Sequence, residues 1–281
     1  MPDVIPADWV EAIHRNSWSV VRQSHCSRTL ALRLTSDGDF VAFGRFPSTD
    51  NAARWVRQEG NLLRRLAAVG IPVPQVQVLD DTGAVLGSPA FLCAAVRGPG
   101  LTQPALVSRL TIQAHALAVA AMHALAWPTL EDVCRVPTRN LAHKELDRLL
   151  VAFPRGHWLH PQIRALERFP STDDDQCLIH RDLTAGNTAG PPESPTLLDW
   201  ECALWGPRAW DLAFIPLFLL GEETEEYRIW LDTYRSRASL PSPESLLFFR
   251  KLVTFRHYRI WNGWPPLSES TLPKLESDEL Q

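Results

Sequence analysis

The stretch Cys177–Leu212, CLIHRDLTAGNTAGPPESPTLLDWECALWGPRAWDL, is the part around which the chain is organised. Its opening apolar run, Cys177–Ile179, predicts the end of a β-strand. A polar loop follows with His180, Asp182 and Asn187, and a segment rich in glycine, proline and serine comes next. The pattern therefore predicts a strand that delivers polar side chains at its end.

A second apolar run, Thr196–Leu198, predicts another strand, and Asp199 stands directly after it. We expect Asp182, Asn187 and Asp199 to lie at the mouths of two neighbouring strands. Such a set suits phosphoryl transfer, because one carboxylate can orient a hydroxyl while the other oxygens bind magnesium. These residues therefore favour a phosphoryl-transfer site.

The ordered motifs of this stretch resemble those of a known family. His180, Asp182 and Asn187 spell H-x-D-x-x-x-x-N, and the second run leads into D-W-E, which begins at Asp199. The pattern resembles the core of the aminoglycoside phosphotransferase and choline kinase group, which is related to the protein kinases with their H-R-D-x-x-x-x-N and D-F-G. Residues 205–213, WGPRAWDLA, are similar to the G-x-P-x-x-D-L-A of that group.

The resemblance runs in order over residues 17–262 and implies an α+β, two-lobed protein-kinase-like fold. A small N-terminal nucleotide-binding lobe with an antiparallel sheet would span residues 1–97. A larger, mainly helical lobe for catalysis and substrate binding would span residues 98–281, with ATP bound between the two. The glycine- and proline-containing link Arg97–Gly100 is typical of such a boundary.

The family motif implies roles for five residues of the core. Asp182 would accept a hydrogen bond from the substrate hydroxyl and take its proton, as a positioned general base does. Asn187 and Asp199 would offer oxygen ligands to Mg²⁺. His180 would support the loop, and Asp211 would hold the backbone amides of the loop.

Five residues of the first lobe are candidates for binding ATP. Arg45 ends an expected strand where protein kinases place a phosphate-binding lysine, the alternative being an exposed strand end. Glu59 would be the partner of that base in the following helix, or a solvated helix residue. The loop expected between the first two strands, residues 23–28, lacks glycine. Its Ser27 would either donate a hydroxyl to phosphate or belong to a plain hairpin turn. The backbone of Ala94 and Val96 would contact adenine, because these residues fall where kinases place the hinge segment.

The second lobe is expected to be built from helices with apolar faces. On the helix expected over Pro104–Ala126, His123 is interpreted as a satisfied core residue without chemistry. Arg181 would pair with a local carboxylate or contact phosphate. The spacing on that helix predicts a core stripe of Leu106, Leu110, Ala114, Leu117, Ala121 and Leu125.

Composition narrows the possible partners. The chain has 281 residues, 45% of them hydrophobic, and a net charge of −4, so it can form real cores but has no basic footprint for nucleic acid. Five cysteines without a C-x-x-C pair predict reduced thiols in a cytoplasmic protein. The most apolar helical stretch, Ala114–Trp127, is too short to span a bilayer, so no membrane partner is expected.

The expected reaction is ATP- and Mg²⁺-dependent phosphorylation of a hydroxyl on a small cationic antibiotic, which would confer resistance. The antibiotic would be an aminoglycoside or a peptide of the viomycin and capreomycin type. The acidic segments 173–175 and 222–226 would attract such a cation, or form a solvated surface and a helix start. The alternatives are a metabolic kinase for choline, an amino alcohol or a sugar, and a nucleotide-binding pseudokinase. We expect a monomer or homodimer.

Overall fold

A computed structural model describes residues 10–11, 15, 19–25, 29–35, 39–45, 52–85, 87–98, 101, 108–126, 133–168, 175–221 and 224–260, with the backbone alone for 19–45. The chain forms two compact units. The first comprises Met1–Pro99 and Ala189–Glu201, and the second comprises Gly100–Thr188 and Cys202–Gln281. Strands dominate the first unit and helices the second, which confirms the expected α+β class.

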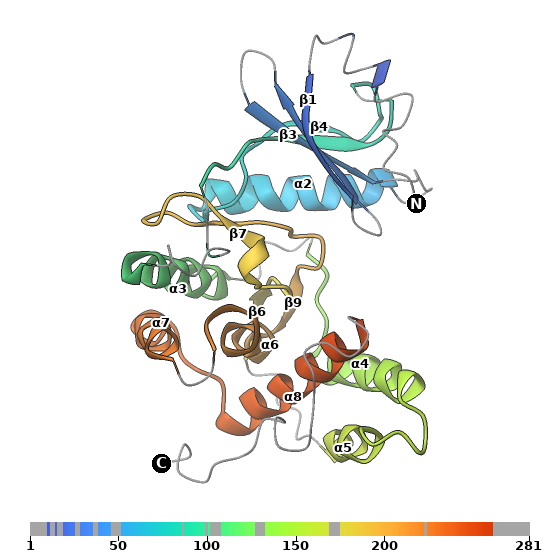
Figure 1. Cartoon of the computed structure of the whole chain (residues 1–281), viewed down its shortest axis with the longest axis vertical. Coiled ribbons are helices and arrows are strands. Elements are labelled where there is room, and N and C mark those ends of the chain that lie inside the picture. Colours follow the sequence, from blue (N-terminus) through green and yellow to red (C-terminus); the bar gives the residue numbers. More distant parts are fainter. Residues whose placement is uncertain are drawn as a thin grey trace. The chain divides into compact units, whose positions relative to one another are not determined.

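A five-stranded antiparallel sheet forms the body of the first unit (Figure 1). Its strands are β1 (Ser19–His25), β2 (Thr29–Thr35), β3 (Asp39–Arg45), β4 (Val76–Asp80) and β5 (Ala90–Ala94). Their order in space is β1-β2-β3-β5-β4, so β5 pairs with both β3 and β4. The register places Thr29 opposite Arg45 and Phe40 opposite Ala94. The β1 strand extends to His25, so residues 23–25 of the expected glycine-free loop over residues 23–28 belong to the strand.

Helix α2 (Ala52–Ala68) packs against this sheet. Its apolar side chains recur at helical spacing, so that Val56, Leu63 and Leu66 are buried. Arg54, Arg57 and Arg64 are exposed. Gly60 allows a close approach, because a β-carbon there would lie 2.6 Å from Leu79 of β4. The middle of α2 is therefore held close to the sheet.

The segment Ala189–Glu201 joins the first unit although it comes late in the chain. The backbone N–H of Leu197 donates to the carbonyl oxygen of Pro72 at 2.8 Å. Gly98, with a φ of +125°, packs against the backbone of Gly190, which leaves no room for a β-carbon at position 98. The first unit is therefore discontinuous along the sequence.

Helices make up most of the second unit (Figure 1). Strands β6 (Gln176–Ile179) and β9 (Leu204–Pro207) add a two-stranded antiparallel sheet, in which Ile179 lies opposite Leu204. No helix among the described residues has the length and apolar character needed to cross a membrane. The helices are α3 (Arg109–His123), α4 (Thr138–Ala152), α5 (His160–Ala165), α6 (Arg208–Phe214), α7 (Glu225–Arg235) and α8 (Pro243–Ile260), with a π-helical turn over Ile215–Leu220 and 3-10 turns over Leu166–Arg168 and Ala185–Asn187.

Helix α6 lies at the core of the second unit. Every residue from Ala209 to Phe214 is buried, as expected of a helix that is surrounded by others. The Trp210 ring packs against Phe249 of α8, with 5.9 Å between the ring centroids. The core therefore fixes α6, which carries Asp211.

The core stripe expected on α3 is wrong. Leu110 and Leu117 are 54% and 39% exposed, whereas His115, Val119 and His123 are buried. Both histidines make hydrogen bonds inside the unit, which allows imidazoles to occupy the inner face. The apolar pattern therefore assigned α3 the wrong face.

The expectation that the two apolar runs of the central stretch form neighbouring strands is also wrong. The first run forms β6, which pairs with β9. The second forms β8 (Thr196–Leu197), which pairs with the short strand β7 (Thr188–Ala189). The two runs belong to different sheets because the chain turns back on itself directly after the polar loop.

Candidate active site

A tight loop after β6, residues 180–187, places Asp182 beside Asn187. The amide nitrogen of Asn187 donates to the main-chain oxygen of Asp182 at 2.8 Å and to its carboxylate Oδ2 at 2.9 Å. The N–H of Thr184 donates to the same main-chain oxygen at 2.8 Å. The Asp182 carboxylate is half-buried and held by its own loop, so it is oriented yet accessible to a substrate hydroxyl.

Asn187 and Asp199 have the donor chemistry that a magnesium ion needs. Because the amide nitrogen of Asn187 is directed at Asp182, its amide oxygen points to the other side. Asp199 is exposed and has a φ of 63°, a left-handed backbone that is uncommon outside glycine. An amide oxygen and a carboxylate oxygen are both hard ligands, so the two residues fit this ion by donor type.

Asp211 anchors the start of the loop from α6. Its side chain is fully buried, and its two carboxylate oxygens accept the backbone N–H groups of His180 and Arg181, each at 2.7 Å. A buried carboxylate is stable when backbone donors satisfy it in this way. The structure therefore agrees with the expectation that Asp211 holds the backbone of this loop.

Glu145 on α4 is a buried carboxylate that three arginines share. Its side chain is 2% exposed, and it lies 2.6 Å from Arg148, 3.5 Å from Arg181 and 4.0 Å from Arg256. The guanidinium of Arg181 also lies over the ring of Trp210, 4.8 Å from its centroid. Burial and the charge of Arg256 lower the pKa of Arg181, whereas Glu145 raises it. Arg181 thus pairs with a local carboxylate.

His123 contacts the same site, although the sequence assigned it no chemistry. Its Nε2 lies 3.3 Å from Oδ2 of Asp211, and its Nδ1 lies 2.8 Å from the hydroxyl of Tyr234. Glu145 was also missed. Its position one helical turn from both Leu141 and Leu149, which are buried, is the signal that could have found it.

The candidate nucleotide-binding residues belong to the first unit. Glu59 is half-buried, and burial together with the charge of Glu59 raises the pKa of Cys93 on β5 to about 12. Arg45 ends β3, and its side chain lies outside the described residues, as does all of Ser27. The N–H of Ala94 donates to the carbonyl oxygen of Gln75 at 3.0 Å.

Strand β5 ends at Ala94, and Val96 follows two residues later. The pairing of Arg45 with Glu59 and the adenine contacts of Ala94 and Val96 stay predictions.

The described members of the two acidic segments have structural contacts. Asp175 forms an ion pair with Arg208 at 3.1 Å. The two glutamates that begin α7 follow the N-cap Thr224, whose hydroxyl accepts a backbone N–H of the first turn, and they suit the positive end of the helix dipole. Residues 173–174 and 222–223 lie outside the described residues.

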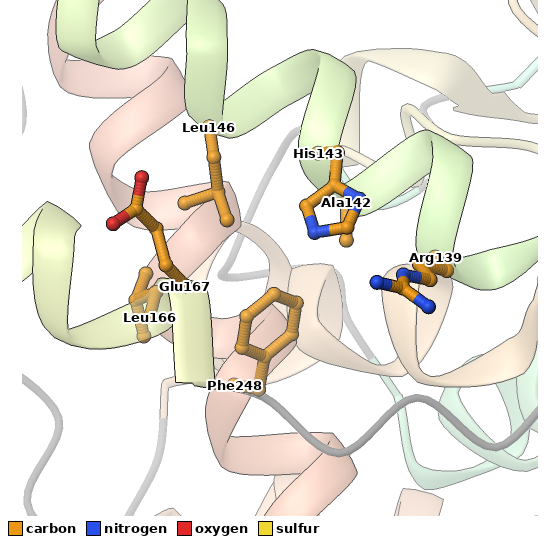
Figure 2. Close-up of a pocket in the computed structure, with 7 residues that line it drawn as sticks. All are labelled: Arg139, Ala142, His143, Leu146, Leu166, Glu167 and Phe248. Atoms are coloured by element: carbon orange, nitrogen blue, oxygen red, sulfur yellow. The ribbon is translucent and has the colours of Figure 1, made fainter.

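A cavity of about 290 Å³ lies between α4 and α8 of the second unit (Figure 2). Figure 2 shows Arg139 and His143 on one side of it and Glu167 on the other, above the ring of Phe248. The carboxylate of Glu167 forms an ion pair with Arg164. None of the site residues predicted from the sequence lines this cavity.

Comparison with known proteins gives a family match over most of the chain. The family model described as the phosphotransferase enzyme family matches residues 21–246. Among solved structures, macrolide 2'-phosphotransferase type I is similar with a TM-score of 0.68 and 18% identity, covering 98% of this chain and 100% of that one. The streptomycin–ATP–APH(2'')-IIa ternary complex is similar with a TM-score of 0.65 and 14% identity, covering 92% and 91%. These likenesses show the two-lobed kinase-like fold.

A curated relative matches over a shorter stretch. A probable ketoamine kinase of Escherichia coli (strain K12) is 32% identical over 96 residues, which are 34% of this chain. The match spans 30% of the length of that relative.

Proposed function

The chain belongs to the phosphotransferase enzyme family and is a small-molecule kinase, and we propose that it transfers the γ-phosphoryl group of ATP to a hydroxyl of a small cationic antibiotic. The observation that carries the proposal is the fixed position of Asp182, because Asn187 donates one hydrogen bond to its carboxylate and one to its main-chain oxygen. A carboxylate fixed in this way can orient a hydroxyl for attack on phosphorus.

Asp182 is the proposed general base. It accepts the hydrogen bond of the acceptor hydroxyl and takes the proton as the oxygen–phosphorus bond forms and ADP leaves. Positioned base catalysis contributes roughly 10²- to 10⁴-fold. Bound magnesium supplies charge neutralisation on the phosphates, and Asn187 and Asp199 are its proposed ligands. Asp211 keeps the loop in register, because its carboxylate holds the two backbone N–H groups before Asp182.

ATP is the proposed donor, with its contacts in the first unit. Arg45 binds the phosphates in a planar fork, and Glu59 orients Arg45. Ser27 donates its hydroxyl to phosphate, and the backbone of Ala94 and Val96 contacts the adenine. The bound ATP in the ternary complex of the same fold supports the choice of ATP as donor.

The acceptor is proposed to be small rather than a protein. Only four residues, 200–203, separate Asp199 from β9, so the chain has no long segment there on which a protein substrate could dock. Proteins of this fold named for macrolides, streptomycin and kanamycin support an antibiotic as the acceptor, and the net charge of −4 suits a cation.

A second candidate is a metabolic acceptor. The 32% identity to a probable ketoamine kinase favours this class, because a ketoamine combines sugar hydroxyls with an amine nitrogen. The contacts of Asp175 with Arg208 and of the first turn of α7 with its cap also weaken the case for a wall of carboxylates around a polycation.

A panel assay tests the proposal. The purified chain and its Asp182→Asn variant are incubated with MgATP and, in turn, kanamycin, streptomycin, a macrolide, viomycin, choline and a fructosyl-amine. We expect ADP release and a phosphorylated product with an antibiotic for the wild type only. Turnover with the fructosyl-amine alone would assign the metabolic candidate, and turnover that Asp182→Asn retains would contradict the role of Asp182.

A further inference from the structure

Two parallel hydrogen bonds join α7 to α3 inside the second unit. The indole Nε1 of Trp230 donates to Nδ1 of His115 at 2.9 Å, and the hydroxyl of Tyr234 lies 2.8 Å from Nδ1 of His123. The Trp230 and Tyr234 rings stack on each other, with centroids 5.2 Å apart and planes 11° apart. All four side chains are buried. The pair of helices thus carries two similar polar contacts, one helical turn apart on α7.

In the part of the chain that the structure describes, only one of these contacts continues by a hydrogen bond to Asp211, although His115 also lies near enough to His180 to be affected by its charge. His123 reaches Oδ2 of Asp211 through Nε2 at 3.3 Å. His115 has no hydrogen-bond partner for its own Nε2 among the described residues. Tyr234, His123 and Asp211 therefore form a continuous buried chain, which we name the α7–loop relay, whereas Trp230 and His115 end the second contact.

The donors in the α7–loop relay have a fixed direction. An ionised carboxylate only accepts hydrogen bonds, so Nε2 of His123 carries the hydrogen that Asp211 receives. The side chains of His123 and Asp211 are both 0% exposed, so bulk water cannot replace either partner. Asp211 Oδ2 also accepts the N–H of His180, so one oxygen joins the imidazole to the backbone of the loop.

We propose that His123 and Tyr234 are positioning residues, which hold Asp211 in the rotamer that fixes the backbone of His180 and Arg181 ahead of Asp182. The proposal deepens the proposed function, because the loop that it concerns carries the general base. It also makes α7, a helix outside the family motif, a part of the machinery that orients Asp182. A purely packing role would need no polar atom at Tyr234, since phenylalanine fills the same space.

Amide hydrogen exchange tests this directly without any substrate. We compare the full-length wild type with Tyr234→Phe and His123→Leu, and use Trp230→Phe as the matched control, which breaks the parallel contact between the same two helices. Exchange at the amides of His180 and Arg181 should accelerate by roughly tenfold or more in the first two variants, as expected within one hydrogen-bond network. In Trp230→Phe it should stay within about twofold of the wild type, because phenylalanine keeps an aromatic ring beside Tyr234 and the lost hydrogen bond to His115 does not involve Asp211.

A conservative variant separates positioning from general loss of packing. In His123→Gln, the side-chain amide can still donate to Asp211 from the position of Nε2 but lacks the Nδ1 that Tyr234 contacts, so exchange at His180 and Arg181 should be slower than in His123→Leu and similar to that in Tyr234→Phe. Equal acceleration in Tyr234→Phe and Trp230→Phe, or no acceleration in either relay variant, would overturn the proposal.

Activity gives a second, separable readout. With the acceptor that the panel identifies, or with water as the acceptor of MgATP hydrolysis, Tyr234→Phe should lower kcat and leave KM for ATP unchanged, while Trp230→Phe retains the wild-type kcat. A wild type that turns over nothing would contradict the proposed function alone. The exchange rates of the loop amides would still decide the role of His123 and Tyr234.

Discussion

The carboxylate of Asp211 accepts the backbone N–H of Arg181 at 2.7 Å, and Arg181 has a φ of 72°. A left-handed backbone at a residue other than glycine costs about 1–3 kcal/mol. A hydrogen bond to a charged group contributes about 1.5–3 kcal/mol, so the bond to Asp211 can offset the strain. The strained residue directly precedes Asp182, which ties the direction of the proposed base to a side chain on α6.

Asn187→Ala removes both side-chain hydrogen bonds to Asp182. We expect kcat to fall by roughly 10- to 100-fold, the range found when a partner that orients a functional group is lost. The magnesium concentration for half-maximal activity should rise as well, because Asn187 is a proposed ligand. Steady-state kinetics over a magnesium titration measures both effects, with Asn140→Ala on the exposed face of α4 as the control. Unchanged kcat and magnesium dependence would rule out this role of Asn187.

Glu145→Gln leaves the guanidinium groups of Arg181 and Arg256 without their shared carboxylate. Removing one partner of a buried ion pair costs about 3–5 kcal/mol, so we expect a loss of unfolding free energy of that order. The matched control is Arg148→Ala, whose side chain is 47% exposed and whose loss should cost about 1 kcal/mol or less. Urea unfolding compares the two, and equal small losses would show that the buried carboxylate is not needed.

His257 gives the second unit a pH-dependent stability. Burial and the charge of Arg256 lower its pKa to about 4, although a hydrogen bond to the carbonyl oxygen of Val253 acts the other way. The unfolded chain titrates near pH 6.5, so between pH 6.5 and 4 it binds a proton that the folded chain does not. Stability should therefore fall as the pH is lowered through this window.

The His257→Phe variant isolates the contribution of His257 to the pH dependence of stability. The wild type should lose up to about 1.4 kcal/mol per pH unit more than the variant between pH 6.5 and 4. His115, whose pKa burial lowers to about 3 with a smaller effect of His180, contributes to both proteins and cancels in the comparison. Parallel curves of unfolding free energy against pH would contradict the assignment.

Gly98→Ala should destabilise the first unit strongly. Its φ of +125° is strained for alanine, and the new β-carbon would collide with the backbone of Gly190. We expect a loss of roughly 3 kcal/mol or more, from strain and overpacking together. Gly156→Ala is the control, because its φ is +100° but nothing lies within 4 Å of the new β-carbon, so strain alone of about 1–2 kcal/mol applies. Equal melting-temperature shifts in the two variants would contradict the close packing of Gly98.

The fold and the contact between Asp182 and Asn187 could be predicted because their signals are local. The spacing of His180, Asp182 and Asn187 is carried by eight consecutive residues, and the structure places Asp182 and Asn187 in direct contact. The role of Asp211 also followed from the family motif and agrees with its two backbone contacts.

The missed features depend on contacts between distant parts of the chain. The inner face of α3 includes His115 and His123, whose partners lie more than 80 residues away, so the apolar pattern pointed to Leu110 and Leu117 instead. Strand pairing has the same origin: nothing in the run that forms β6 specifies β9 rather than β8 as its partner.

The most direct test of the central claim is the rate of phosphoryl transfer by Asp182→Asn, measured with ATP affinity on the same preparation. Asparagine retains the size of the side chain but cannot take a proton, so we predict a fall in kcat of roughly 10²- to 10⁴-fold. Binding of MgATP should stay near the wild-type affinity, because Asp182 is proposed to act on the acceptor hydroxyl. A variant that binds ATP and transfers phosphate at the wild-type rate would contradict the assignment of Asp182 as the general base.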